Sequence, residues 1–345
     1  METVSGDYID AMLREVEIAR ISAPGSVPTI FFGGGTPSLL PAHDLGRVIT
    51  AIKSGWEVDG DCEITLEANP DSVDATKLAQ FREAGFNRVS FGMQSAVPHV
   101  LATLDRTHNP ENVARAVEAA RAARFSSVSV DLIYGTPGES LADWRTSVES
   151  ALSLGVDHIS AYALIVEAGT KLANQIKRGE LSMPDDDVMA DMYLLVDQLA
   201  NDAGLSWYEL SNWSKPGHES RHNVAYWKNA NWWGLGPGAH SHRDGVRWWN
   251  IKHPTAYKSA LFAGTTVIAE SETLTASQLA DEAIMLQIRM REGIALSKLS
   301  ADQISRIEAY SQTGHLDKER WLKGTLQLTP SGRLIADRIV RELVV

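Results

Sequence analysis

The chain has 345 residues, 44% of them hydrophobic and 22% charged, a composition that is typical of a globular protein and long enough for one barrel of about 200–250 residues and a smaller domain. The formal net charge of −12 excludes a general nucleic-acid partner, because phosphate binding needs clustered Lys and Arg. The single cysteine, Cys62, excludes an internal disulfide and an all-cysteine metal site built from this chain alone.

Helix and strand patterns alternate through the first half of the chain. Apolar residues at helical spacing predict a helix at 7–20, and an apolar run predicts a strand at 29–32. Further helices are predicted at 45–52, 75–84, 112–123 and 141–154, and further strands at 64–68, 88–92, 127–134 and 158–165. The strands are short and nearly continuously apolar, as expected where both faces of a parallel sheet are buried. The fold class is therefore α/β: a barrel, complete or partial, in which a helix precedes the first strand.

The second half differs in character. One long amphipathic helix is predicted at 184–203, and seven of the ten tryptophans then lie between Trp207 and Trp249. Short helices begin near residue 275, and the stretches 299–309 and 326–342 predict a small, mostly helical, winged-helix-like domain. We expect three parts: a barrel core at 1–205, an aromatic and histidine-rich connecting segment at 206–270, and the C-terminal domain at 271–345. No apolar stretch approaches the about 18 residues of a membrane span, and no signal pattern opens the chain, which indicates a soluble cytoplasmic protein.

The predicted strands end in glycines or hydrogen-bonding groups. The first strand stops at three glycines, Gly33, Gly34 and Gly35, whose consecutive N–H groups suit a carboxylate, a phosphate or an amino acid. Because ligands bind at the carboxyl ends of parallel barrel strands, we expect these ends to form one site for a small polar ligand. Glu67 can hold an amino acid part and Asp131 a ribose part. A glycine run by itself is equally typical of an ordinary loop.

Four of these stretches resemble a known family. Residues 32–37 (FGGGTP), 67–70 (EANP), 90–95 (SFGMQS) and 131–137 (DLIYGTP) resemble the radical S-adenosylmethionine proteins related to oxygen-independent coproporphyrinogen III oxidase. Residues 208–213 (YELSNW), 215–217 (KPG) and 221–227 (RHNVAYW) resemble the heme chaperone branch of that family, the HemW group. The resemblance runs from about residue 7 to the C-terminus, and it implies a partial (β/α)6 barrel of the radical-SAM type that lacks its first strand.

The resemblance implies a binding site for S-adenosylmethionine. The implied contacts are Gly34, Gly35 and Thr36 for the amino and carboxylate groups, Ala163 on the adenine side, and Glu67, Gln94, Arg106 and Asp131 for the rest of the cofactor. The chemistry of two of these residues agrees, since a guanidinium offers a fork of donors to a carboxylate and a buried carboxylate can accept from two ribose hydroxyls.

The chain departs from the family in one feature. The family holds a [4Fe–4S] cluster with three cysteines in a Cys-x-x-x-Cys-x-x-Cys loop after the first strand, and this sequence has no such motif. Cys62 lies outside that place and is interpreted as an incidental small hydrophobe. Two hypotheses remain open: the sequence begins at an internal Met of a longer protein that carries the motif, or the protein is a paralogue without a cluster that binds heme without radical chemistry.

A second site is implied near the tryptophans. His222, Asn223, Tyr226 and Trp227 match the motif that the chaperone branch is thought to use near heme. A neutral imidazole is a good axial iron ligand, and aromatic rings provide a flat apolar wall for a porphyrin. The alternative is that His222 is a satisfied core histidine among rings that pack the barrel against the C-terminal domain. The resemblance places His240 near the cofactor, and His218 and His242 are expected at the surface.

Two functions follow from the resemblance. In the first, the protein binds heme and S-adenosylmethionine and delivers heme to membrane-bound respiratory proteins. In the second, it is an oxygen-independent coproporphyrinogen III oxidase that decarboxylates two propionates. The stretches at 208–213 and 221–227 favour the carrier. A winged-helix DNA regulator is excluded by the acidic charge and by the lack of a basic recognition helix.

Overall fold

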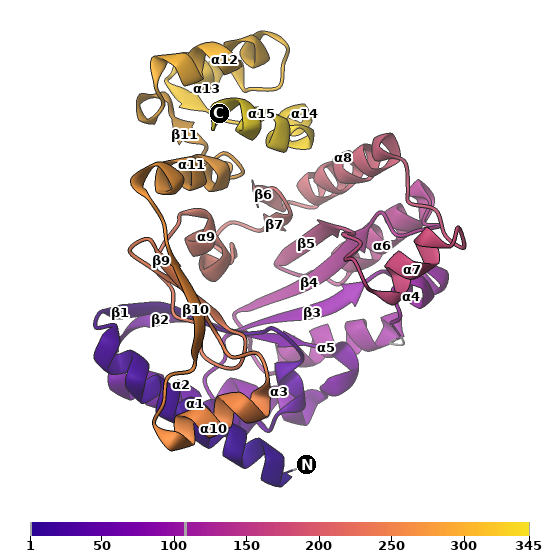
Figure 1. The fold of residues 1–345 in the computed structure, drawn as a ribbon. Helices are drawn as coiled ribbons and strands as arrows, with labels where there is room; N and C mark the ends of the chain where they lie inside the picture. The colour runs from indigo at the N-terminus through magenta and orange to yellow at the C-terminus, as the bar shows by residue number, and fades with distance from the viewer. Residues whose placement is uncertain (1, 107–108, 345) are drawn as a thin grey trace.

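A seven-stranded sheet organises the first two thirds of the chain (Figure 1), whose computed structural model describes residues 2–106 and 109–344. The strand order is β1-β2-β3-β4-β5-β7-β6, and β1 to β5 are parallel neighbours. The strands are β1 (Ser26–Phe32), β2 (Glu57–Ala68), β3 (Arg88–Gln94), β4 (Ser127–Tyr134), β5 (His158–Ala163), β6 (Ser206–Glu209) and β7 (Asn212–Ser214). The predicted α/β class and partial parallel barrel are confirmed.

Two features of this sheet were not predicted. The short strands β7 and β6 extend it beyond β5 in the antiparallel sense. In addition, β2 begins seven residues earlier than the predicted start at 64, so that Cys62 lies inside this strand and is buried. The expected position of Cys62 ahead of the strand is therefore wrong, while its interpretation as a small buried residue agrees with its burial.

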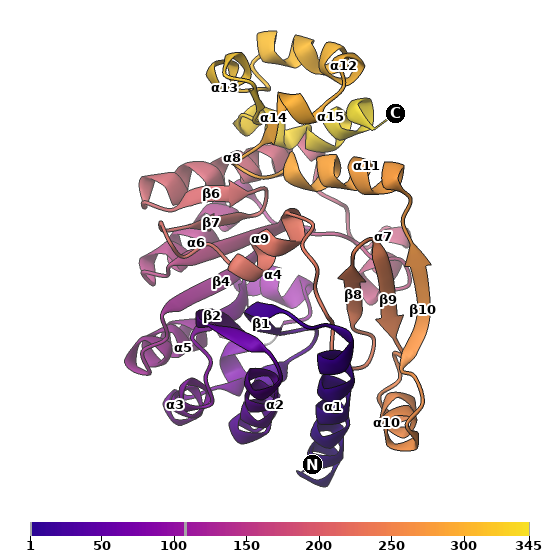
Figure 2. The same cartoon turned by 90° about the vertical axis from the view of Figure 1, so that its left-hand side faces the viewer.

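Helices cover one face of the sheet, as Figure 2 shows for α2, α3, α5 and α6. The helices of this part are α1 (Glu2–Ser22), α2 (Ala42–Gly55), α3 (Ala75–Glu83), α4 (Pro98–Thr103), α5 (Pro110–Ala122), α6 (Leu141–Ser153), α7 (Lys171–Lys177) and α8 (Asp186–Asp202), with 3-10 turns at Pro37–Leu39 and Pro70–Ser72. The apolar side chains of alternate strand residues, such as Leu66, Val89 and Val130, are fully buried against these helices. The residues between them face the other side of the sheet, and many are polar.

The expectation that both faces of the strands are apolar is therefore wrong. Thr65 and Glu67 on β2, and Ser129 and Asp131 on β4, alternate with the buried apolar residues. This polar face lies inside the partial barrel, where it can serve a ligand. The alternation of polar and apolar residues along these strands is visible in the sequence, but the apolar residues of the buried face dominate the hydrophobic pattern.

The aromatic and histidine-rich segment forms a small layer on the open side of the barrel (Figure 2). It contains α9 (Arg221–Trp227), β8 (His240–Arg243), β9 (Val246–Asn250), α10 (Pro254–Ala263) and β10 (Ile268–Thr273), and its three strands pair antiparallel in the order β10-β9-β8. Glu15 of α1 joins this layer to the barrel, because its buried carboxylate accepts from Gly236 N at 2.7 Å and from Asn250 Nδ2 at 2.6 Å.

The C-terminal module has its own apolar core around Ile288, Ile307, Leu326 and Ile339. Its elements are α11 (Ala276–Gln287), β11 (Ile294–Ala295), a 3-10 turn at Leu296–Lys298, α12 (Ala301–Gln312), α13 (Lys318–Leu322), β12 (Thr325–Leu326), α14 (Pro330–Leu334) and α15 (Ala336–Leu343). The strands β11 and β12 pair antiparallel. The module is thus mostly helical, and both its winged-helix character and the divisions at residues 205 and 270 stay predictions.

One buried ion pair connects this module to the barrel. Arg333 of α14 donates to both carboxylate oxygens of Asp197 on α8, at 2.9 and 2.7 Å. Trp213 Nε1 also donates to Asp197, at 2.8 Å, and the guanidinium lies 4.3 Å from the ring centroid of Trp207. Such a pair is held in place because either partner alone would be a buried, uncompensated charge. Within the described ranges, no helix has the length and hydropathy needed to cross a membrane.

Candidate functional site

The carboxyl ends of the parallel strands enclose a cavity of about 580 Å³, named here the strand-end cavity. Seven of the eight residues predicted to contact S-adenosylmethionine line it: Gly35, Thr36, Glu67, Gln94, Arg106, Asp131 and Ala163. The eighth, Gly34, lies in the same loop as Gly35, and its N–H bonds to the Glu67 carboxylate. Residues from five strand ends are thus gathered in one place, although 127 positions separate Thr36 from Ala163 along the chain.

The glycine loop after β1 depends on two of its glycines for different reasons. A Cβ on Gly33 would lie 2.4 Å from the Phe31 ring and 2.7 Å from Glu67 Oε2, so only glycine allows this close approach. Gly34 has φ of 81°, the left-handed region that favours glycine. The loop therefore brings main-chain N–H groups against the Glu67 side chain with no intervening side chain.

Glu67 is poised to change its charge near neutral pH. The pKa of Glu67 is raised to about 7, first by burial and then by the neighbouring Asp131 carboxylate, while a hydrogen bond from the Gly34 N–H partly opposes both. A buried carboxylate beside another carboxylate attracts a cation, because a positive charge between them stabilises both ionised forms. The part of the strand-end cavity beside Glu67 and Asp131 therefore suits a cationic ligand group.

Asp131 is held between two serines of the neighbouring strands. Ser90 Oγ on β3 donates to it, 3.0 Å from each carboxylate oxygen, and Ser160 on β5 also bonds to it. Burial raises the pKa of Asp131, and these hydrogen bonds oppose the rise. The two serines fix the carboxylate in one orientation, as a group that accepts from ligand hydroxyls must be.

Gln94 and Arg106 complete the rim. The strand β3 has a register shift between Gly92 and Gln94, and Gln94 has φ of 62°, which is uncommon for a residue other than glycine. A bulge at a strand end turns a side chain toward a site. Arg106 is exposed at the rim of the cavity. The next two residues of the sequence, Thr107 and His108, lie outside the described residues.

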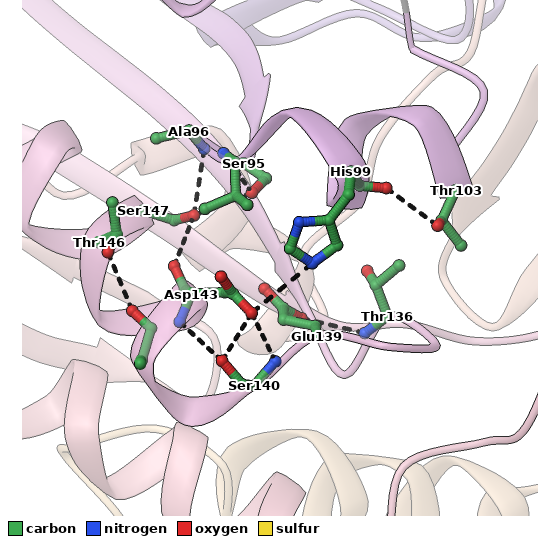
Figure 3. A network of polar contacts seen from close by, with 12 residues as sticks. Ser95, Ala96, His99, Thr103, Thr136, Glu139, Ser140, Asp143, Thr146 and Ser147 are labelled. Carbon is green, nitrogen blue, oxygen red and sulfur yellow. Dashed lines mark hydrogen bonds and ion pairs between the residues drawn. The ribbon is translucent and has the colours of Figure 1, made fainter.

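A polar network supports the strand ends from behind (Figure 3). Ser147 of α6 bonds to Ser95 Oγ at 2.9 Å and accepts from Ala96 N at 3.1 Å, which ties the end of β3 to α6. Near the end of β4, the Thr136 N–H donates to the buried Glu139 carboxylate at 3.0 Å. Burial raises the pKa of Glu139 to about 7. The end of β3 is therefore anchored to α6, and the turn after β4 is closed by its own hydrogen bond.

Two residues that line the bottom of the strand-end cavity, Arg88 and Thr65, were not predicted from the sequence; we call this part the floor. Arg88 is buried there and donates to Ser127 Oγ at 2.9 Å and to His218 O at 3.0 Å, and it forms no ion pair with any described residue. The Thr65 hydroxyl is buried without a hydrogen-bond partner in the described part of the chain. The signal that could have found them is the period of two that places Thr65 with Glu67 and Arg88 with Ser90.

His158 adds a neutral group to this floor. Its Nδ1 lies 2.8 Å from Ser129 Oγ and its Nε2 lies 2.8 Å from Tyr208 OH. Burial lowers the pKa of His158 well below its ordinary value, so the ring is uncharged at neutral pH. The floor therefore combines one cation, Arg88, with neutral hydrogen-bonding groups.

A second cavity, of about 930 Å³, lies along β1 and the glycine loop, on the side of the aromatic segment. We name it the aromatic cavity. Its aromatic lining residues are Tyr8, Phe31, Phe32, Trp56, Tyr226, Trp232 and Trp233, and three histidines also line it: His222, His240 and His242. Since His222 and Tyr226 line both cavities, the two sites share a wall.

His222 is a satisfied histidine in this structure. Its Nδ1 lies 2.8 Å from Thr29 Oγ1 and its Nε2 lies 3.1 Å from Tyr226 OH. The ring stacks on Phe31 with centroids 4.9 Å apart, and burial lowers the pKa of His222 to about 4. The ring is therefore neutral, and both of its nitrogens have partners.

The other predicted heme residues are placed differently. Asn223 lines only the strand-end cavity, where its Nδ2 donates to the buried Glu209 at 3.1 Å. Trp227 lines neither cavity, and its Nε1 is buried without a partner among the residues described. The motif thus contributes residues to both cavities, while Trp227 lies outside both of them.

His242 corrects the expectation that it lies at the surface. It is only 3% exposed, because residues around Trp232 cover it. Trp232 N donates to His242 O at 2.9 Å, His242 N donates to Trp232 O at 3.1 Å, and the two rings lie 4.8 Å apart. No periodic pattern in the sequence indicates this isolated pairing. His218, also expected at the surface, is partly buried.

Comparison with known proteins relates this geometry to a family. The model of the radical SAM superfamily matches residues 7–151. The chain is 47% identical over 339 residues to the heme chaperone HemW of Mycobacterium tuberculosis, with 98% of this chain and 86% of that protein aligned. The chain belongs to the HemW family. Heme chaperone HemW of Bacillus subtilis is 34% identical over 297 residues, which cover 85% of this chain and 78% of that protein.

The fold of the HemW family member described here is similar to that of a solved structure. Coproporphyrinogen III oxidase (HemN) from Escherichia coli, described as a radical SAM enzyme, superposes with a TM-score of 0.84 at 19% identity, covering 100% of this chain and 84% of that one. At this identity the likeness shows the fold alone. It agrees with the radical-SAM partial barrel predicted from the sequence.

Membership of a radical SAM family implies S-adenosylmethionine and a [4Fe–4S] cluster, and the residues fit these two groups differently. The strand-end cavity fits S-adenosylmethionine, because it offers glycine N–H groups and a guanidinium for a carboxylate, and two carboxylates for cationic and hydroxyl groups. The unpartnered Thr65 hydroxyl in the same cavity also awaits a polar partner.

The described residues do not fit the cluster. No group of three His, Cys, Asp or Glu side chains in the described part of the chain is arranged to hold a metal ion. Burial raises the pKa of the Cys62 thiol to about 11, whereas a thiolate is the form that binds iron.

Proposed function

We propose that this protein is a heme chaperone that binds S-adenosylmethionine in the strand-end cavity and heme in the aromatic cavity. The observation that carries this proposal is the 47% identity, over nearly the whole chain, to a protein named heme chaperone HemW. The aromatic cavity supports it physically, because a cavity of about 300–1,000 Å³ with mostly apolar walls is typical of cofactor-sized ligands. Its volume of about 930 Å³ lies in that range.

The cofactor half of the proposal assigns roles to the strand ends. The loop of Gly34, Gly35 and Thr36 receives the amino and carboxylate groups. Arg106 donates to the carboxylate, Glu67 accepts from the ammonium, and Asp131 accepts from the ribose hydroxyls. Gln94 and Ala163 are the remaining proposed contacts, with Ala163 on the adenine side. When bound, the cofactor supplies the sulfonium chemistry for which the family is named. The protein's own part is to bind it and orient it, and the positive charge of the ligand favours the ionised form of Glu67 beside it.

The heme half of the proposal uses the shared wall. His222, Asn223, Tyr226 and Trp227 remain the residues proposed to act near heme. His222 and Tyr226 support this role because their neutral, hydrogen-bonded rings line the aromatic cavity. A neutral, rigid wall suits the face of a porphyrin, which is itself apolar.

The recipients of the heme are proposed to be membrane-bound respiratory proteins, and the site of action the cytoplasm. The first part rests on the resemblance of residues 208–213 and 221–227 to the heme chaperone branch, and the second on the apolar pattern and the single cysteine of the sequence. The alternative activity, oxidation of coproporphyrinogen III, is favoured only by the fold that the chain has in common with HemN. One fold serves many chemistries, so this likeness weighs less.

One pair of assays tests the proposal. The full chain is titrated with ferric heme and followed by the heme absorption band, and in parallel it is supplied with S-adenosylmethionine, a reductant and coproporphyrinogen III. Saturable heme binding supports the chaperone, whereas a missing product is not counted in its favour, because the described residues do not fit the cluster that the oxidation needs. Formation of protoporphyrinogen IX, or a titration with no saturation, contradicts it.

A further inference from the structure

The three histidines of the aromatic cavity differ in the nitrogen that they can offer to iron. An imidazole ligates a metal through a nitrogen that carries a lone pair and has no competing hydrogen bond. His222 has no such nitrogen free, since Thr29 and Tyr226 occupy both. His240 is exposed, and its ring stacks on Trp249 with centroids 5.7 Å apart. The comparison leaves His242 as the buried candidate.

The hydrogen bond of His242 fixes which nitrogen holds the proton. Its Nδ1 lies 3.2 Å from the carbonyl oxygen of Ala230. A carbonyl can only accept, so Nδ1 is the protonated nitrogen and Nε2 carries the lone pair. A histidine that binds a metal generally has this arrangement, with its other N–H donated to a carbonyl or carboxylate that orients the ring.

His242 Nε2 is an acceptor that the rest of the structure leaves unexplained. It is buried and has no hydrogen-bond partner in the described part of the chain. Buried polar atoms are almost always satisfied, because an unmade hydrogen bond costs about 1–3 kcal/mol. A buried lone pair on a residue that lines a large aromatic cavity is accounted for if a ligand atom takes it.

The surroundings of His242 suit a porphyrin. The ring of Trp232 lies over His242, and the ring of Tyr226 lies 4.8 Å from that of Trp232 at 83°. Because Trp232 covers His242, a ligand atom reaches Nε2 only if this indole turns aside. Arg243, the next residue, also lines the cavity and offers a guanidinium to a propionate.

We propose that His242 Nε2 is the axial ligand of the iron of bound heme, and that His222 is a positioning residue that holds the wall of the cavity through Thr29 and Tyr226. This inference rests on the proposed heme-binding function. It differs from the prediction made from the sequence motif, which assigns the iron to His222.

The test compares matched variants of the full chain: His242→Asn, His222→Asn and His240→Asn. The side-chain amide of asparagine can donate the hydrogen bond that histidine Nδ1 makes, which in His242→Asn is the bond to the Ala230 carbonyl, and asparagine has no atom in the place of Nε2. Each variant is first compared with the wild type by circular dichroism and thermal unfolding. Ferric heme is then added, and its absorption and electron paramagnetic resonance spectra are recorded with and without free imidazole.

Wild type and His240→Asn are expected to give the same histidine-ligated spectra. His222→Asn is expected to keep the histidine-ligated spectrum but to bind heme more weakly, because it removes the contacts of the cavity wall with Thr29 and Tyr226. His242→Asn is expected to lose that signature, to bind heme roughly tenfold or more weakly, and to regain the signature when imidazole is added. A folded His242→Asn variant with unchanged spectra overturns the inference and leaves the proposed function standing. Loss of ligation in His222→Asn alone also overturns it. A wild type that binds no heme overturns both.

Discussion

The charge of Glu67 should set the pH dependence of S-adenosylmethionine binding. Burial and the Asp131 carboxylate raise the pKa of Glu67 to about 7, so this carboxyl is partly protonated at neutral pH when the cavity has no cation. The ligand's ammonium and sulfonium groups bind the ionised form, which means that binding expels the proton. Affinity should therefore rise with pH up to the pKa and level off above it.

The size of the effect follows from the ionised fraction. With a pKa of about 7, Glu67 is roughly one tenth ionised at pH 6 and roughly nine tenths ionised at pH 8. The dissociation constant should therefore fall about tenfold between these values, which corresponds to about 1.4 kcal/mol. At pH 7, binding should release about half a proton per ligand.

Titration calorimetry at pH 6, 7 and 8, in buffers of different ionisation enthalpy, measures both the affinity and the protons released. Glu67→Gln is the control, because it keeps the shape of the side chain and cannot titrate. The ligand's own amino group titrates equally with both proteins, so the ratio of their dissociation constants isolates Glu67. A ratio that is constant from pH 6 to pH 8 would refute the reasoning.

Three further predictions concern single buried groups. In the same calorimetry, Asp131→Ala should weaken S-adenosylmethionine binding about tenfold or more, because hydrogen bonds to a charged group contribute about 1.5–3 kcal/mol. Unchanged affinity would show that Asp131 does not contact the ligand. Glu139 has a pKa of about 7 in the folded protein, so its contribution to stability is present at low pH and lost as pH rises through 7. In urea unfolding, Glu139→Gln should therefore recover about 2 kcal/mol of the unfolding free energy at pH 8 relative to pH 5, and an identical pH slope in both proteins would contradict this. Arg333→Met should lower the unfolding free energy by about 3–5 kcal/mol, because it leaves the Asp197 carboxylate buried and unpaired. Adding Asp197→Leu should restore part of the loss, and a double variant no more stable than Arg333→Met would show that the unpaired Asp197 charge is not the cause.

The elements with a strong hydrophobic period were predictable. The five parallel strands, the helices between them and the long helix α8 occur where the sequence predicts them. The strand ends were predictable for the same reason, since parallel strands bring their carboxyl ends to one edge. Gln94 and Asp131 therefore lie in one cavity with Glu67 although no local pattern connects them.

Short elements and isolated pairings were not predictable. The strands β6 and β7 are only four and three residues long, and they depend on pairing with β5 rather than on their own sequence. His242 is buried by its pairing with Trp232, a long-range contact with no periodic signal. Arg88 was missed because an arginine at the start of an apolar strand is usually exposed, whereas here it lies under the cavity.

The measurement that tests the account most directly is a titration of the full chain with ferric heme, in which tryptophan emission and the heme absorption band are followed together. The account places heme against Trp232 and Trp233, so it predicts that emission is quenched in step with the change in the heme band and that both saturate at one heme per chain. Heme binding that saturates at one equivalent without quenching, or no saturation at all, would contradict it.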